Sequence, residues 1–160
     1  MPSENINKCA EAIAQKNWKI AFVESATAGR MCSEFSLTDF SGKILRGGIS
    51  CYEVFIKENI LKVPHGLIKK YTAESLEVTK SLAENALELF NCEVIVAVTG
   101  LTAPGGSETI EKPVGTMFLY IIMPNKNIAH TTIFEGNPEE IVMQTIDRLA
   151  KLMLEELKTI

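Results

Sequence analysis

Hydrophobic residues recur at helical spacing in several parts of the chain. Near the N-terminus they stand three and four residues apart, which predicts an amphipathic helix with Ser3 as its N-cap. The same spacing predicts a long helix over 73–90 with Thr72 as its cap. A last helix is expected to begin with Asn137 as its cap and Pro138 in its first turn. Two shorter helices are expected, one ending near Phe35 and one over 55–61.

Short apolar runs rich in β-branched residues predict the strands of a sheet. The runs at 19–24 and 93–98 are almost continuously apolar, as is typical of strands inside a parallel sheet. Gly47 and Gly48 interrupt another run, and a glycine pair predicts a bulge or a close backbone approach. Residues 124–127 join the last two runs and predict a hairpin. The expected strands cover 19–24, 43–52, 93–98, 114–123 and 128–134.

The order of these elements predicts an α/β fold. Helices alternate with strands through most of the chain, which favours a three-layer α/β/α sandwich with a mostly parallel sheet. The C-terminal hairpin makes that sheet mixed, because hairpin strands are antiparallel. The length of 160 residues fits a single domain over 1–160.

Composition and charge narrow the classes of function. Lys and Arg number 16 against 20 Asp and Glu, so the net charge of −4 argues against a nucleic-acid partner, while a small anionic ligand still fits. The four cysteines form no C-x-x-C pair and the two histidines stand apart, so no metal and no cofactor are expected. The N-terminus shows no basic and apolar signal, and the longest apolar stretch, 114–124, is too short for a bilayer span. These features predict a cytoplasmic protein without a membrane partner.

Three polar or glycine-containing segments follow predicted strands, at 24–29, 47–57 and 99–106. Ligands of α/β sheets bind beyond the carboxyl ends of the strands, and helix N-termini favour anions. The pattern alone therefore predicts a phosphate or nucleotide site. It leaves open a structural interpretation, in which Ser25 and Thr27 are ordinary helix caps, Lys57 is a solvated surface lysine and Tyr52 is a packing residue.

The same segments, taken together and in order, resemble the CinA C-terminal domain family, whose enzymatic members are nicotinamide mononucleotide deamidases. The resemblance covers nearly the whole chain and implies the same three-layer fold. The matching segments are 24–29 for E-S-C-T-G-G, 47–57 for G-G-x-x-x-Y-x-N-E-A-K, 97–106 for A-V-T-G-I-A-G-P-G-G and 112–116 for K-P-V-G-T.

The resemblance implies hydrolysis of the carboxamide of nicotinamide mononucleotide, a small-molecule nucleotide substrate, to nicotinate mononucleotide and ammonia. It gives Ser25 the position of the nucleophile and Lys57 that of the base, with Tyr52 relaying the proton or orienting the amine. A base role requires that the pKa of Lys57 be lowered by burial or by nearby positive charge. The residues expected to bind substrate, phosphate or oxyanion are Glu24, Thr27, Ala28, Gly29, Gly47, Gly48, Thr99, Gly100, Pro104, Gly105 and Gly106. Family members are generally oligomeric, so a homo-oligomer is expected.

Several positions depart from the family pattern. Ala28 replaces a glycine, and alanine would strain the turn if that position needs a positive φ. The other departures are Ala103 for a glycine, Val54 and Phe55 for Asn-Glu, and Pro138 and Val142 for two arginines. Arginine suits phosphate, so Arg30 and Arg46 are the replacements to look for. The alternative hypothesis is a catalytically impaired family member that acts as a nucleotide-binding or protein-interaction module.

Overall fold

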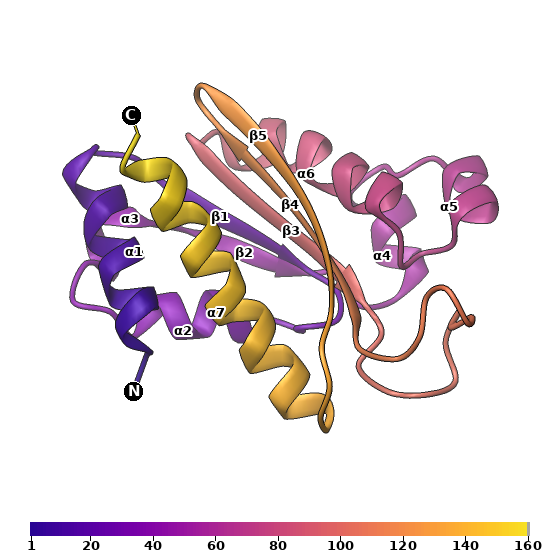
Figure 1. Cartoon of the computed structure of the whole chain (residues 1–160). Helices are drawn as coiled ribbons and strands as arrows, with labels where there is room; N and C mark the ends of the chain where they lie inside the picture. The colour runs from indigo at the N-terminus through magenta and orange to yellow at the C-terminus, as the bar shows by residue number, and fades with distance from the viewer. Residues whose placement is uncertain (160) are drawn as a thin grey trace.

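A computed structural model describes residues 1–159 and shows three layers, a central sheet with a layer of helices on each face (Figure 1). The strand order is β2-β1-β3-β4-β5. Strands β2, β1 and β3 pair in parallel, whereas β4 is antiparallel to both β3 and β5. The strands are β1 (Ile20–Glu24), β2 (Leu45–Ser50), β3 (Val94–Gly100), β4 (Thr116–Met123) and β5 (Lys126–Ile133). The α/β class and the mixed sheet with a parallel centre are confirmed.

Helices cover both faces of the sheet, as Figure 1 shows. One face carries α1 (Glu4–Gln15), α2 (Arg30–Ser36), α3 (Ser41–Ile44) and α7 (Pro138–Leu157), and the other carries α4 (Val54–Asn59), α5 (His65–Tyr71) and α6 (Leu76–Phe90). No helix within residues 1–159 is long and apolar enough to cross a membrane.

The sheet separates two hydrophobic cores, and the side chains of β1 point alternately into one and the other. Phe22 points into the core beneath α1 and α7, while Ala21 and Val23 point into the core beneath α6. Successive side chains of a strand face opposite ways, so a continuously apolar strand fills both cores.

Two predicted helix caps are confirmed and one is wrong. The Ser3 hydroxyl accepts a hydrogen bond from the Ile6 amide at 3.3 Å, and Asn137 forms a reciprocal capping box at the start of α7. The long helix begins at Leu76 and is capped by Ser75, not Thr72. Thr72 instead ends α5, a helix that the pattern did not predict, with a left-handed φ of 72°.

The glycine pair in β2 produces both features expected of it. Pairing with β1 shifts between Ile20 and Ala21, so that Leu45 and Gly47 are the successive partners and Arg46 is bulged. A Cβ on Gly48 would lie 3.1 Å from the Phe22 carbonyl oxygen, which is tighter than ordinary contacts. Glycine therefore lets β2 lie close to β1 and α2.

The three parallel strands end at the same edge of the sheet, at Glu24, Ser50 and Gly100. Backbone hydrogen bonds continue the pairing one residue further, from the Ser25 amide to the Val98 carbonyl at 3.0 Å and from the Cys51 amide to the Glu24 carbonyl at 2.8 Å. These bonds place the loops that follow the strands next to one another.

Candidate active site

A serine and a lysine meet at this edge of the sheet. Ser25 directly follows β1, and Lys57 projects from α4 so that its Nζ lies 2.8 Å from the Ser25 Oγ. The same Nζ donates to the Cys51 carbonyl at 2.6 Å and to the Tyr52 carbonyl at 3.1 Å. Lys57 is 1% exposed and Ser25 is 7% exposed. The structure thus brings together the predicted nucleophile and base, and Lys57 is no solvated surface lysine.

Burial changes the chemistry of this amine. Loss of water disfavours the ammonium form and lowers the pKa of Lys57, while Cys51 and the Glu74 carboxylate oppose the shift. A neutral amine keeps two N–H donors and one lone pair. The carbonyls of Cys51 and Tyr52 can take both donors, which leaves the lone pair for the Ser25 hydroxyl.

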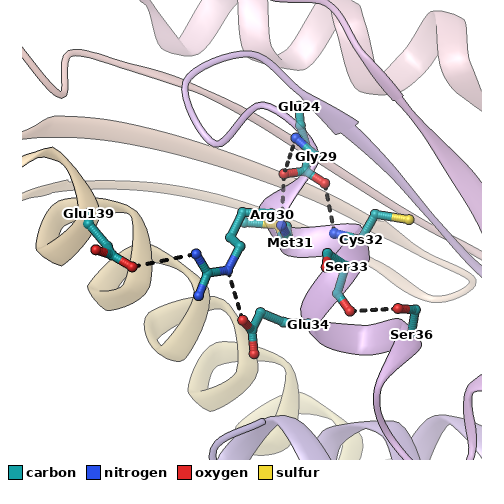
Figure 2. A network of polar contacts seen from close by, with 9 residues as sticks. All are labelled: Glu24, Gly29, Arg30, Met31, Cys32, Ser33, Glu34, Ser36 and Glu139. Carbon is teal, nitrogen blue, oxygen red and sulfur yellow. Dashed lines mark hydrogen bonds and ion pairs between the residues drawn. The ribbon is translucent and has the colours of Figure 1, made fainter. Parts of the chain in front are cut away.

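The Glu24 carboxylate holds the turn that presents Ser25. It is 1% exposed and accepts hydrogen bonds from the Thr27 hydroxyl at 2.5 Å and from the amides of Gly29, Met31 and Cys32 at 3.1, 2.9 and 2.7 Å. Figure 2 shows the three amides converging on it at the start of α2. An anion at a helix N-terminus satisfies amides that lack helical partners. Glu24 and Thr27 therefore support the turn that presents Ser25.

Two consecutive residues of that turn are left-handed. Ala28 has a φ of 48° and Gly29 a φ of 96°. An L-residue with a Cβ pays about 1–2 kcal/mol for this conformation. The alanine at position 28 is thus a strained replacement for glycine, as the motif comparison predicted.

A cleft of about 210 Å³ opens over Ser25. Of the predicted site residues it is lined by Ser25, Tyr52, Gly100, Pro104, Gly105 and Gly106. The Tyr52 side chain is 69% exposed, and the contact between Tyr52 and Lys57 runs through the Tyr52 carbonyl rather than the phenol. Glu74, which the sequence did not suggest, also lines this cleft.

Seven predicted binding residues do not line this cleft: Glu24, Thr27, Ala28, Gly29, Gly47, Gly48 and Thr99. The Thr99 hydroxyl is buried against the Thr79 hydroxyl at 2.9 Å. Gly48 lines a separate cavity of about 310 Å³ between α2 and β2, and Gly47 faces the Phe90 ring. Gly47, Gly48 and Thr99 thus take part in the packing around β2 and β3.

An amide of the glycine loop after β3 already binds a carboxylate from the same loop. The Gly105 amide donates to the Glu108 carboxylate at 2.8 Å. This and neighbouring backbone hydrogen bonds lower the pKa of Glu108, so it stays ionised. Any oxyanion or phosphate held by this loop must use amides other than that of Gly105 or displace Glu108.

The arginines proposed as phosphate ligands are engaged elsewhere. The Arg30 guanidinium pairs with Glu34 at 2.8 Å and with Glu139 at 3.6 Å, beside the start of α7 (Figure 2). The Arg46 guanidinium donates to the Asn91 carbonyl at 3.1 Å. Val142 packs against the core beneath α7, and the residues that line the cleft include neither it nor Pro138. Within residues 1–159, no three His, Cys, Asp or Glu side chains gather as metal ligands.

Comparison with known proteins identifies relatives over almost the whole chain. The family model described as CinA C-terminal domain matches residues 3–157. A CinA-like protein of Prochlorococcus marinus is 37% identical over 115 residues, covering 72% of this chain and 27% of the relative. A CinA-like protein of Desulfotalea psychrophila is 30% identical over 151 residues, covering 92% of this chain and 36% of the relative. The chain thus spans about a third of the length of these curated relatives.

Solved structures share the fold at lower identity. A CinA superfamily protein from Klebsiella pneumoniae superimposes with a TM-score of 0.91 at 20% identity, covering 98% of both chains. The competence/damage inducible protein CihA from Agrobacterium tumefaciens superimposes with a TM-score of 0.88 at 24% identity, covering 99% of this chain and 98% of that one.

Proposed function

The chain belongs to the CinA C-terminal domain family, and from that premise we propose that it is an amidohydrolase that converts nicotinamide mononucleotide and water to nicotinate mononucleotide and ammonia. The observation that carries the proposal is the 2.8 Å contact between the Lys57 Nζ and the Ser25 Oγ at the base of the cleft. The choice of substrate rests on the resemblance of the four motifs.

The first half of the proposed reaction acylates the serine. Neutral Lys57 takes the Ser25 proton while the Ser25 Oγ attacks the carboxamide carbon. The carbonyl oxygen becomes an oxyanion, for which the amide of Ala26, next to the nucleophile in the cleft wall, is the first candidate donor. The Lys57 ammonium then protonates the leaving nitrogen, ammonia departs and an ester on Ser25 remains.

The second half returns the enzyme to its starting state. Lys57 takes a proton from water as the water oxygen attacks the ester carbon. The Ser25 oxygen leaves and recovers its proton from Lys57, and nicotinate mononucleotide is released. One buried amine thus serves as base and acid in both halves, so no histidine is needed.

The direct test measures ammonia release from nicotinamide mononucleotide, with nicotinamide riboside as the control. Turnover of the nucleotide but not the riboside supports the proposal and shows that the phosphate is recognised. If ammonia appears from neither compound with folded protein, the amidase proposal is wrong.

A non-catalytic nucleotide-binding module is the second candidate. The engagement of Arg30 and Arg46 away from the cleft favours an impaired family member, because a weakly held phosphate would position the carboxamide poorly over Ser25. Binding of the nucleotide in calorimetry without ammonia release would support this candidate.

A further inference from the structure

The cleft carries a negative charge that the proposed mechanism does not use. Glu74 lies in the turn between α5 and α6 and shares the cleft wall with Ser25. A carboxylate there is unfavourable for a base such as Lys57, because it stabilises the ammonium form that cannot accept a proton. It also disfavours a substrate phosphate at the same place. Its presence therefore points to a different part of the substrate.

Hydrogen bonds fix Glu74 in this wall. The Ser107 hydroxyl donates to the Glu74 carboxylate at 2.5 Å. The Lys112 ammonium donates to the Thr72 hydroxyl at 2.6 Å, the Glu74 carbonyl at 2.9 Å and the Ser107 hydroxyl at 2.9 Å. This cluster ties the 72–75 turn to the loop that follows β3. Glu74 is thus a positioned group of the cleft and not a free surface side chain.

No side chain within residues 1–159 forms a direct ion pair with the Glu74 carboxylate, and the Lys112 ammonium reaches it through the Ser107 hydroxyl that both groups bind. Lys112 also contacts the Glu74 backbone carbonyl. Because Glu74 and Ser25 line the same cleft, a ligand bound over Ser25 would lie within reach of the field of this carboxylate.

We propose that Glu74 selects substrates that carry a positive charge on the ring bearing the scissile carboxamide. The inference rests on the proposed amidase function and adds to it the group that recognises the cation. A pyridinium ring over Ser25 gains attraction from Glu74, and it cancels the field of Glu74 at Lys57. The correct substrate then makes its own base more effective, and a neutral ring does not.

The first experiment compares nicotinamide mononucleotide with its reduced form, in which the ring is an uncharged dihydropyridine and the ribose, phosphate and amide are the same. Glu74→Gln removes the charge but keeps an oxygen that can accept from Ser107. The control is Glu77→Gln, an exposed position in the first turn of α6. The readout is kcat/KM for nicotinamide mononucleotide divided by kcat/KM for its reduced form. The two substrates differ in intrinsic reactivity, but this difference is the same for every variant, so it cancels when the ratios of two variants are compared.

The ratio should fall at least about tenfold in Glu74→Gln and stay unchanged in Glu77→Gln, as expected for the loss of one carboxylate charge near a bound cation. If Glu74 had only a structural role, Glu74→Gln would lower kcat/KM equally for both substrates and leave the ratio unchanged. An equal ratio in wild type and Glu74→Gln overturns the inference and leaves the amidase proposal standing.

A second readout needs no amide turnover. Two phosphonothiolates of matched size are compared as inactivators, one with a trimethylammonium on the phosphonyl group that stays on Ser25 and one with a neutral tert-butyl group in the same place. The Ser25 Oγ bonds to phosphorus, its proton passes to Lys57 and the thiolate leaves. A preference for the cation that disappears in Glu74→Gln supports the inference even if nicotinamide mononucleotide proves not to be the substrate. The same rate ratio in both proteins contradicts it.

Discussion

Replacing Lys57 by methionine should abolish catalysis without unfolding the protein. Methionine fills a similar volume but has no proton-accepting group, so we expect kcat to fall by at least about 10²-fold, the usual contribution of a general base. Stability changes less, because two effects oppose each other. The carbonyls of Cys51 and Tyr52 lose a donor, worth about 0.5–1.5 kcal/mol each, while the desolvation of a buried amine is relieved.

Lys57→Arg separates proton transfer from electrostatics. Arginine keeps the positive charge but does not release its proton at neutral pH, so it should fail almost as badly as methionine. The assay is ammonia release at saturating nucleotide, with circular dichroism and thermal unfolding to confirm that each variant is folded. Recovery of most of the activity in Lys57→Arg would refute the assignment of Lys57 as the base.

The pH dependence follows from the direction of the pKa shift. The reactive form of Lys57 is neutral, so kcat/KM should rise with pH through a pKa that burial holds below 10.5. The unfolded chain binds more protons than the folded one between the lowered pKa and 10.5. The free energy of unfolding of wild type relative to Lys57→Met should therefore increase with pH in that interval. A rate that falls with rising pH would exclude a neutral-lysine mechanism.

Three other substitutions test the turn that presents the nucleophile. Ser25→Ala should abolish ammonia release and leave the melting temperature nearly unchanged, and a folded variant with normal turnover would remove Ser25 from the mechanism. Glu24→Gln should lower the free energy of unfolding by about 1–3 kcal/mol, measured by urea denaturation, because the charge-assisted bonds to the start of α2 are weakened. Ala28→Gly should raise the free energy of unfolding by up to about 1 kcal/mol, since glycine adopts the φ of 48° without strain, and a destabilised variant would contradict that account.

The succession of strands along the chain and the first and last helices could be predicted because their signals are local. The caps at Ser3 and Asn137 and the bulge at the β2 glycines depend on residues within one or two turns of the feature. The structure of residues 62–75 was harder to predict from the sequence. Its hydrophobic residues pack against the second core from α5, and Thr72 takes a left-handed φ that no composition rule assigns to a β-branched residue.

That error also hid Glu74. A helix over 73–90 would place Glu74 in an ordinary solvated first turn, where an acidic residue needs no further explanation. The structure instead has a turn over 72–75, and the bonds from Ser107 and Lys112 hold it against a loop more than thirty residues away. The sequence offered one hint of this turn, because Lys112 belongs to one of the matched motifs. The residues that Lys112 contacts depend on tertiary packing and could not be predicted from the sequence.

The pairing of Ser25 with Lys57 depends on the parallel centre of the sheet. Because β1 and β2 run the same way, Ser25 and Cys51 emerge side by side, joined by the bond from the Cys51 amide to the Glu24 carbonyl. Lys57 lies six residues after Cys51, and residues 52–53 together with the first turn of α4 bring its amine back over the Cys51 carbonyl. The amine is buried by the same turn that positions it. Placement and pKa are therefore set by one element, so a substitution that loosens α4 should alter the position of the base and its protonation together.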